Sequence, residues 1–263
     1  MERLAHAAER LDGPLEDRAA ITGNLRDLRR VNRFLGGARL SIQALECVAA
    51  DTDRPLDVLD VGTGSADIPL AMLASPANVS IERIVAVDRN PEVLAAARLL
   101  DPGLDQERRL EMRLADGISL PYPDKSFDVA HSSLLVHHLE PADAQQLMSE
   151  LRRVARVGVV VNDLVRSRMS WAGAWLMAHF LSGNRLTHHD APLSVRRAYT
   201  LPELIHLTEA AGLRVAGTFR GPFGHRRALA LRPSDSTADA GVGAVLSRPP
   251  GQLKGRVELD EPW

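Results

Sequence analysis

The chain of 263 residues contains a single cysteine, Cys47, so an intramolecular disulfide and a cysteine-based zinc site are both excluded. Aromatic residues make up only 4% of it. No run of apolar residues reaches the ~18 that a membrane-spanning helix needs. Lysine is scarce as well, because all but two of the 32 basic residues are arginine. This bias extends over the whole chain and therefore indicates no particular site.

Charge and composition exclude further classes of protein. The formal net charge is −2, with 32 basic against 34 acidic residues, which argues against a generally basic nucleic-acid-binding surface. A 45% hydrophobic composition at this length is typical of a folded protein with a large core. Residues 1–18 are too highly charged for a signal peptide, so we expect a cytoplasmic protein.

From about residue 57 onward, short apolar runs alternate with amphipathic stretches. This alternation is typical of a parallel sheet covered by helices on both faces. The predicted strands are 57–61, 84–88, 110–116, 127–132, 157–164, 214–219 and 226–231. The last two are separated by Gly221-Pro222-Phe223-Gly224, which favours an antiparallel hairpin. We therefore predict an α/β, doubly wound, mostly parallel sheet that ends in an antiparallel strand.

Three segments lie outside this alternation. Residues 1–50 contain leucines spaced for one apolar stripe, which predicts an N-terminal helical cap. Residues 166–198 carry an apolar helix between the fifth strand and the last helix, and we expect them to form a lid insert within a domain at 51–232. Residues 233–263 are rich in Pro, Gly, Ser and Asp, which predicts a mobile or loosely docked tail.

The strongest motif is a glycine-rich turn, Asp60-Val61-Gly62-Thr63-Gly64, which follows the first predicted strand and precedes a helix. Glycines let the backbone turn sharply and approach a ligand closely, and a helix N-terminus favours electron-rich groups. A dinucleotide fingerprint would place a third glycine at position 67, where this chain has Asp67. Asp60 would repel a pyrophosphate, so the turn favours a cationic ligand such as an ammonium or sulfonium group.

Two further acids close the next predicted strands. Asp88 ends the second strand, where a carboxylate can accept hydrogen bonds from both ribose hydroxyls. Asp116 ends the third strand and precedes Gly117, so this pair can hold the edge of an adenine. A single aspartate at a strand end is usually a cap. Three such acids beside a glycine turn indicate a nucleoside site.

These residues resemble the class I S-adenosylmethionine (SAM)-dependent methyltransferases, above all the small-molecule branch that includes the ubiquinone/menaquinone C-methyltransferases. The resemblance covers about residues 55–232. The matching motifs are Asp60-x-Gly62-x-Gly64, Val87-Asp88-Arg89-Asn90, Ala115-Asp116-Gly117, Ser126-Phe127-Asp128-Val129 and Leu135-Val136-His137-His138-Leu139. It implies SAM as the cofactor and a seven-stranded, Rossmann-like sheet whose last strand is antiparallel.

The resemblance also implies roles for individual residues. Asp88 would hold the ribose, Arg89 would flank the adenine, and Asp116 would hold its edge. Ser132 would lie beside the sulfonium, and Arg33 would reach the SAM carboxylate from an N-terminal helix that closes over the cofactor. The full cofactor-binding set that it implies is Asp60, Gly62, Thr63, Gly64, Asp88, Arg89, Asp116, Gly117, Ser132 and Arg33.

Histidine is the expected general base, because its ordinary pKa lies close to neutrality. His137 and His138 follow the fourth predicted strand, where the active site of this family opens, and we expect His137 to face the cofactor. His189, in the insert, is the second candidate. No metal site is expected, because the fourth strand ends in Ser132-Ser133 rather than in an acid.

The acceptor is expected to be a small apolar molecule. Trp171 and Trp175 on the insert helix are predicted to line its pocket, with core packing, a membrane-surface contact or a homodimer contact as alternatives. Residues 151–232 hold 13 arginines against four acids, and Arg196 is the candidate for binding an anionic acceptor. Nucleic acid is not expected as substrate, because the fourth strand lacks the Asn/Asp-Pro-Pro-aromatic loop of amino-methylating enzymes that act on nucleobases.

The sequence therefore predicts methyl transfer from SAM to a phenolic oxygen or an activated ring carbon of a quinone-pathway or polyketide-type molecule. Three alternatives remain open: a SAM-binding regulatory protein without transfer activity, an NAD(P)-dependent oxidoreductase that uses the same glycine turn, and a protein methyltransferase, which the composition of the lid insert disfavours because it suggests a closed pocket. Asp67 and the absence of a Tyr-x-x-x-Lys pair argue against the oxidoreductase.

Overall fold

The computed structural model describes residues 1–5, 7, 9, 17–76 and 79–234. Residues 1–233 form one compact unit, and a second unit begins at Ser234. The tail predicted at 233–263 lies almost wholly outside the described residues, so that prediction stays open. The N-terminal helices belong to the first unit.

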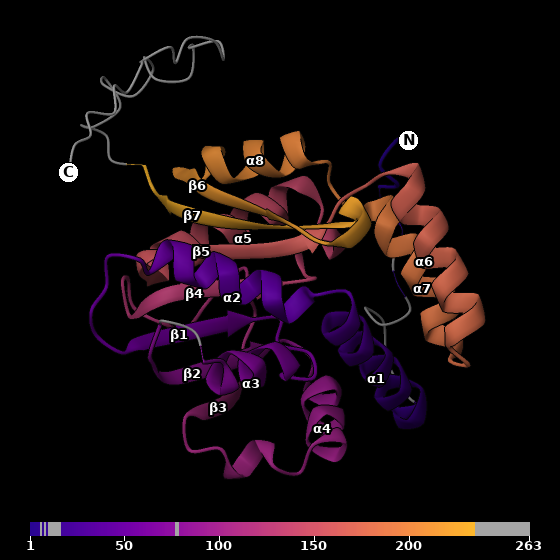
Figure 1. The fold of residues 1–263 in the computed structure, drawn as a ribbon, viewed down its shortest axis with the longest axis horizontal. Coiled ribbons are helices and arrows are strands. Elements are labelled where there is room, and N and C mark those ends of the chain that lie inside the picture. The colour runs from indigo at the N-terminus through magenta and orange to yellow at the C-terminus, as the bar shows by residue number, and fades with distance from the viewer. Residues whose placement is uncertain (6, 8, 10–16, 77–78, 235–263) are drawn as a thin grey trace, which may run out of the picture. The chain divides into compact units, whose positions relative to one another are not determined.

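Seven strands form one sheet among the described residues. They are β1 (Leu56–Val61), β2 (Ile81–Asp88), β3 (Leu110–Leu114), β4 (Phe127–Ser133), β5 (Ala155–Leu164), β6 (Leu213–Arg220) and β7 (Arg226–Pro233). Their order in the sheet is β3-β2-β1-β4-β5-β7-β6. The first five strands pair in parallel, and β7 runs antiparallel to both β5 and β6. The predicted fold class is confirmed (Figure 1).

The described residues form eight α-helices, five of which begin at a residue whose side chain caps the helix. They are α1 (Arg18–Phe34), α2 (Gly37–Val48), α3 (Asp67–Ala74), α4 (Pro91–Leu100), α5 (Pro141–Val154), α6 (Arg168–Leu181), α7 (Arg185–Arg197) and α8 (Leu201–Ala210). Asp17 caps α1 by accepting hydrogen bonds from two backbone N–H groups, and Thr200 with Glu203 forms a capping box on α8. Short 3₁₀ turns occupy Leu104–Gln106 (η2), Val136–His138 (η3) and Pro222–Gly224 (η4), the last within the predicted hairpin turn.

The sheet carries helices on both faces, because successive side chains of a strand point to opposite sides. Leu59 of β1 packs in a core with Leu147 of α5 and residues of α8. Val58, its neighbour, packs in a second core with Leu45 of α2 and residues of α3. Strands that are buried on both faces explain the nearly continuous apolar runs that the sequence shows.

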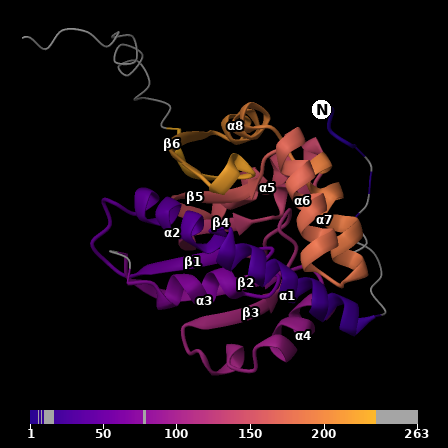
Figure 2. The ribbon, with the colours of Figure 1, turned by 45° about the vertical axis from the view of Figure 1, so that its right-hand side comes forward.

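The insert predicted at 166–198 consists of α6 and α7, which lie side by side (Figures 1 and 2). Helix α7 also contacts α1 and η3. The insert, the N-terminal helix and the segment after β4 therefore meet at one end of the sheet. None of the helices in the described part of the chain is both long and apolar enough to cross a membrane.

Candidate active site

The glycine turn after β1 is tight and tied to the neighbouring strand. Gly62 and Gly64 have φ of +74° and +56°, in the left-handed region that favours glycine. The N–H groups of Gly62 and Thr63 both donate to the carbonyl of Val87, at 2.9 Å each. A Cβ on Gly62 would lie 3.0 Å from the side chain of Leu135. Because Gly62 has no side chain, the backbone of the turn lies close to the loop that follows β4.

A cavity opens beside this turn at the carboxyl ends of β1, β2 and β4. The strand order reverses between β1 and β4, and ligands of open α/β sheets bind at such a point. Eight of the ten predicted cofactor residues line the cavity. They are Asp60, Gly62, Thr63, Gly64, Asp88, Arg89, Asp116 and Gly117.

Asp88, the last residue of β2, is held by backbone N–H groups. One carboxylate oxygen accepts from Gly64 N at 3.1 Å, and the other accepts from Asn90 N at 3.0 Å. Burial raises the pKa of Asp88 and outweighs the opposing effect of these two hydrogen bonds. The carboxylate is thus fixed in orientation at the cavity wall, where it can accept hydrogen bonds from a diol such as a ribose.

Asp60 has a partner that the sequence did not reveal. Its side chain is buried, and Oδ1 lies 2.5 Å from Nδ1 of His131. Nε2 of His131 lies 2.8 Å from the hydroxyl of Ser41 in α2. Asp60 therefore lines the cavity and is oriented from behind by a histidine of the core.

Asp116 lies just beyond β3, which ends at Leu114 and not at residue 116 as predicted. Its exposed carboxylate accepts from Ile118 N at 3.2 Å. A Cβ on Gly117 would lie 2.7 Å from Cγ1 of Val61 and 3.2 Å from Cδ1 of Leu147. Gly117 therefore allows this segment to pack directly onto the end of β1 and form one wall of the cavity.

Thr63 provides a test of whether these residues fit SAM. Its buried hydroxyl lines the cavity and has no hydrogen-bond partner among the described residues. Buried polar atoms are normally hydrogen-bonded, so this hydroxyl is suited to a polar group of a ligand. The carboxylates of Asp60, Asp88 and Asp116 add acceptors for an ammonium, a ribose and an adenine edge. The residues fit the cofactor.

The two histidines of η3 differ in their surroundings. His137 is buried, and its Nδ1 lies 2.6 Å from Oδ1 of Asp163 in β5. Burial raises the pKa of Asp163, but the interactions with His137 and with the N–H of Leu164 outweigh it and bring the pKa below its ordinary value. His138 is partly buried and lines the cavity, whereas His137 does not. The structure therefore places the histidine that the sequence did not favour at the cavity.

The backbone next to His138 is held by three donors from distant segments. The guanidinium of Arg197, at the end of α7, donates to the carbonyl of His138. The hydroxyl of Tyr199 and Nη2 of Arg3 donate to the carbonyl of Leu139 at 2.8 and 2.7 Å. Burial raises the pKa of Tyr199 to about 12, so its hydroxyl keeps the proton that it donates. Both the insert and the N-terminal segment thus fix the position of η3.

A buried arginine behind the cavity wall holds residues of that wall by hydrogen bonds. Arg226 of β7 is fully buried, and its Nε and Nη1 donate to Oδ1 of Asn162 and Asn32 at 2.6 and 2.7 Å. Its Nη2 donates to the hydroxyl of Ser133. Nδ2 of Asn32 in turn donates to Asp67 at 3.0 Å. Burial lowers the pKa of Arg226 to about 10. Asn32, Asp67 and Ser133 line the cavity, and no local sequence pattern connects them to one another.

Two predicted cofactor residues lie outside the cavity wall. Ser132 is buried and its hydroxyl donates to the carbonyl of Val61 at 3.1 Å, so Ser133 and not Ser132 lines the cavity. Alternate residues of β4 face opposite sides of the sheet, which explains the difference. Arg33 is exposed with its guanidinium 5.9 Å from the ring of Phe34, and Asn32 takes its place at the cavity.

The other predicted acceptor-site residues also lie outside this cavity. Trp171 and Trp175 of α6 are 37% and 41% exposed. Arg196 is exposed, and the side chain of His189 is 41% exposed with Nδ1 2.7 Å from Asp190. Their contact with an acceptor stays a prediction. The same holds for contact of the two tryptophans with a membrane surface or a second copy of the chain.

The comparisons with known proteins agree with this fold. Residues 59–161 match the family described as a methyltransferase domain. The match begins in β1 and ends in β5, and so covers the glycine turn and η3. The fold and the family match support a class I SAM-dependent methyltransferase domain, as the sequence predicts.

Individual relatives share parts of their length with the chain. It is 34% identical over 131 residues to the methyltransferase GfsG of Streptomyces halstedii, covering 49% of this chain and 44% of that protein. It is 29% identical over 160 residues to a ubiquinone/menaquinone biosynthesis C-methyltransferase of Geobacter sulfurreducens, covering 60% of this chain and 58% of the relative. The chain thus spans about half the length of the curated relatives that it matches.

Solved structures support the fold. An O-methyltransferase family protein from Burkholderia thailandensis aligns with a TM-score of 0.63 at 14% identity, covering 84% of this chain and 61% of that one. A SAM-dependent methyltransferase from Aquifex aeolicus aligns with a TM-score of 0.54 at 17% identity, covering 83% and 98%.

Proposed function

We propose that this protein transfers the methyl group of SAM to a small-molecule acceptor. The observation that carries the proposal is the joint presence, around one cavity, of three strand-end carboxylates, the buried hydroxyl of Thr63 and the imidazole of His138. The first four groups fit a nucleoside that carries an ammonium and a sulfonium. The imidazole adds a proton acceptor to the same cavity.

In this proposal the cavity residues orient the cofactor. Asp88 accepts hydrogen bonds from the ribose, Asp116 binds the adenine edge, and Asp60 with Thr63 binds the methionine end. Bound SAM supplies an electrophilic methyl group on a sulfonium. The protein then has to hold the acceptor in line with that group and remove its proton where the acceptor carries one.

His138 is the side chain placed to receive that proton. Its backbone is fixed by Arg197, and its ring lies against that of His137 with 4.2 Å between the centroids. His137 is itself oriented by Asp163. His137, which the sequence favours as the base, thus becomes a positioning residue.

An apolar acceptor is favoured by the side chains around His138. Leu135 and Leu139 flank it in the chain, and Leu25 and Leu28 of α1 line the same cavity. The name of the Geobacter relative, a quinone-biosynthesis C-methyltransferase, supports an activated ring carbon, and a phenolic oxygen is equally compatible with an imidazole base. We propose an acceptor of quinone-pathway or polyketide type.

Calorimetric titration with S-adenosylhomocysteine, with NADPH in parallel, tests the cofactor. We expect micromolar binding of S-adenosylhomocysteine that Asp88→Ala weakens at least tenfold, about 1.4 kcal/mol. Asp105→Ala, at an exposed acid that does not line the cavity, is the matched control. Binding of NADPH alone would overturn the proposal.

Transfer itself is tested with methyl-labelled SAM and a panel of phenols and quinols. Labelled product identifies the acceptor class and the atom that is methylated. Tight binding of S-adenosylhomocysteine with no product from any acceptor would favour the SAM-binding regulatory alternative.

A further inference from the structure

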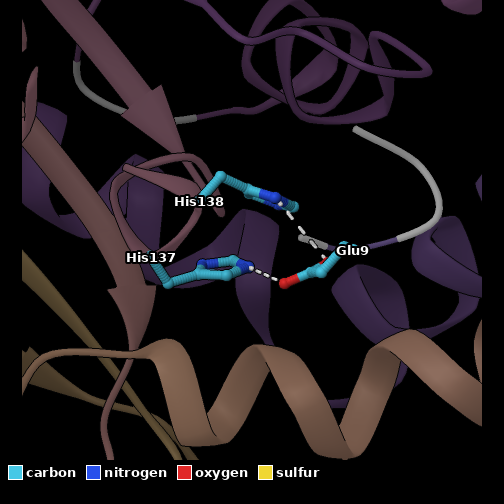
Figure 3. Close-up of side chains that lie close together, drawn as sticks. All are labelled: Glu9, His137 and His138. Carbon is cyan, nitrogen blue, oxygen red and sulfur yellow. Dashed lines mark ion pairs between the residues drawn. The ribbon is translucent and has the colours of Figure 1, made fainter. Parts of the chain in front are cut away.

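We propose that Glu9, His137 and His138 form a binding site for one divalent transition-metal ion, such as Zn²⁺, at the margin of the cavity. One donor atom from each residue lies within 4.8 Å of the other two. Figure 3 shows a ring nitrogen of each histidine directed at the carboxylate of Glu9. The three residues come from the N-terminal segment and from η3.

The distances suit an ion between the groups better than direct hydrogen bonds. Oε1 of Glu9 lies 3.9 Å from Nε2 of His137, and Oε2 lies 3.7 Å from Nδ1 of His138. Both separations exceed the hydrogen-bond range. Donor atoms around a tetrahedral zinc ion are about 3.3 Å apart, given metal–ligand distances of about 2.0 Å. Movements of roughly half an ångström would therefore bring the Glu9 carboxylate to this separation from each ring nitrogen.

The hydrogen bonds of His137 favour a positive charge between its ring and the carboxylate of Glu9. The Asp163 carboxylate accepts from two backbone N–H groups, and a hydrogen bond to Nδ1 of His137 requires the proton on that nitrogen. The lone pair of Nε2 then faces the carboxylate of Glu9. Glu9 is only 3% exposed, and its Oε1 has no hydrogen-bond partner in the described part of the chain. A buried carboxylate that faces a lone pair is unfavourable, and a cation bound between the two groups relieves it.

Asp163 supplies the outer support that metal-binding histidines usually have. Such histidines donate their second ring N–H to a carboxylate or carbonyl, which fixes the tautomer and the ring orientation. Nδ1 of His137 has this partner at 2.6 Å. The N-terminal segment that bears Glu9 is also anchored, because Arg3 donates to Glu140 at 2.9 Å and to the carbonyl of Leu139. These supports distinguish the cluster from a chance approach of three side chains.

Two imidazoles and one carboxylate select the class of ion. Mg²⁺ and Ca²⁺ prefer oxygen ligands, whereas Zn²⁺, Fe²⁺ and Co²⁺ bind two histidines and one carboxylate with further positions open. His138 also lines the cavity, so an open position on the ion would be within reach of that cavity. Resting on the proposed function, we assign this position to an oxygen of the acceptor. An ion held there would lower the pKa of the acceptor hydroxyl, so that its proton could leave to bulk water, and His138, with Nδ1 on the ion, would position that oxygen in place of taking up its proton.

The sequence predicts no metal site, because the predicted fourth strand ends in serines and not in an acid. Glu9 precedes the sheet by many residues, and no spacing pattern connects it to His137. Only the folded chain brings the three ligands together.

The test is titration of the full chain, freed of metal with a chelator, with ZnCl₂ by calorimetry and with CoCl₂ by visible absorption. We expect one ion per chain with a Kd in the micromolar range or below, and a cobalt spectrum of low coordination number. Glu9→Gln and His138→Ala should each weaken binding at least tenfold. His189→Ala is the control, since it removes an exposed histidine that also pairs with a carboxylate. Circular dichroism verifies that each variant is folded.

Absence of saturable binding, or binding that Glu9→Gln and His138→Ala leave unchanged, would overturn the proposal. Titration of the same samples with S-adenosylhomocysteine separates the two proposals. Loss of nucleoside binding with intact metal binding contradicts the methyltransferase function, and the reverse result contradicts the metal site alone.

Discussion

Nη1 of Arg226 donates to Oδ1 of Asn32 at 2.7 Å, a contact between residues 194 positions apart in the chain. It joins β7, in the C-terminal hairpin, to α1, which forms part of the cavity wall. A Cβ on Gly37 would lie 2.5 Å from the same nitrogen, so the start of α2 must be glycine for the guanidinium to fit. The position of α1 over the cavity therefore depends on one buried cation at the opposite end of the sequence.

Arg226→Met should destabilise the fold and weaken cofactor binding together. The substitution removes three hydrogen bonds from a charged, fully buried group, and we expect the free energy of unfolding to fall by about 3 kcal/mol. Asn32 and Ser133 lose the partner that orients them in the cavity wall, so affinity for S-adenosylhomocysteine should fall as well. Urea denaturation and calorimetry measure the two effects.

The neighbouring residue provides the control for Arg226. Arg227 is only partly buried, and Arg227→Met should change the free energy of unfolding by no more than about 0.5 kcal/mol. Equal effects of the two substitutions would mean that the buried network contributes nothing particular to stability.

Two glycines should respond in opposite directions to replacement by alanine. A Cβ at position 117 would overlap Val61 at 2.7 Å, and we expect Gly117→Ala to cost about 1–3 kcal/mol and to weaken binding of S-adenosylhomocysteine. A Cβ at position 173, within α6, meets nothing within 4 Å. Gly173→Ala should therefore stabilise the protein by about 0.5–1 kcal/mol, because alanine favours the helix. Thermal unfolding of both variants measures the difference, and a stable Gly117→Ala variant with normal affinity would contradict the close packing at the cavity.

The parts of the site that the sequence predicts are those encoded locally. The turn at Gly62 and Gly64 and the acids Asp88 and Asp116 each lie at the end of a strand or within a few residues of it, and the parallel strands bring these ends to one edge of the sheet. The strand–helix alternation likewise predicts the sheet and its final hairpin. Such signals depend on a few consecutive residues, so they can be read without knowing the tertiary structure.

Ser132 and Arg33 lie outside the cavity wall because strand register and long-range packing decide which neighbouring residue faces the cavity. The choice between Ser132 and Ser133 depends on which side of the sheet each faces, and a shift by one residue reverses it. Arg33 and Asn32 are likewise adjacent on α1, whose rotation about its axis is set by packing against α4 and α7. The side chain of Asn32 faces Arg226, which no pattern near either residue reveals. Physical contact between distant segments decides these positions.

Asp128 predicts how stability should depend on pH. Its buried carboxylate is bound by Arg54 and Arg156 and by the backbone N–H of Asp57. Burial raises its pKa, but the two arginines and the N–H outweigh this effect and lower the pKa from 3.8 to about 2. Because the folded-state pKa is the lower one, the carboxylate stabilises the fold above about pH 4 and this contribution is lost as the pH falls to about 2.

Asp128→Asn should therefore lower the free energy of unfolding by about 2 kcal/mol at pH 7. The variant should also lose less stability than the wild type between about pH 4 and pH 2, and urea denaturation across this range measures both effects. Asp124→Asn, at an acid that is 76% exposed beside Arg153, should change stability by less than about 0.5 kcal/mol. If the free energies of unfolding of the wild type and of Asp128→Asn fell equally between about pH 4 and pH 2, that result would contradict the assigned pKa.

The two candidate histidines are separated by turnover with whichever acceptor the screen identifies. His138 lines the cavity, so in protein freed of metal His138→Ala should lower kcat about 10²–10⁴-fold, the contribution of a positioned proton acceptor, while affinity for S-adenosylhomocysteine changes little. His189 is 41% exposed and lies outside the cavity wall, and His189→Ala should retain kcat within about twofold. If His138→Ala turned over rapidly and His189→Ala were inactive, the proton acceptor would be His189 of α7. The insert would then have to close over the acceptor. Because both variants keep the glycine turn and the three acids, equal binding of S-adenosylhomocysteine by both confirms that the comparison concerns transfer and not the cofactor.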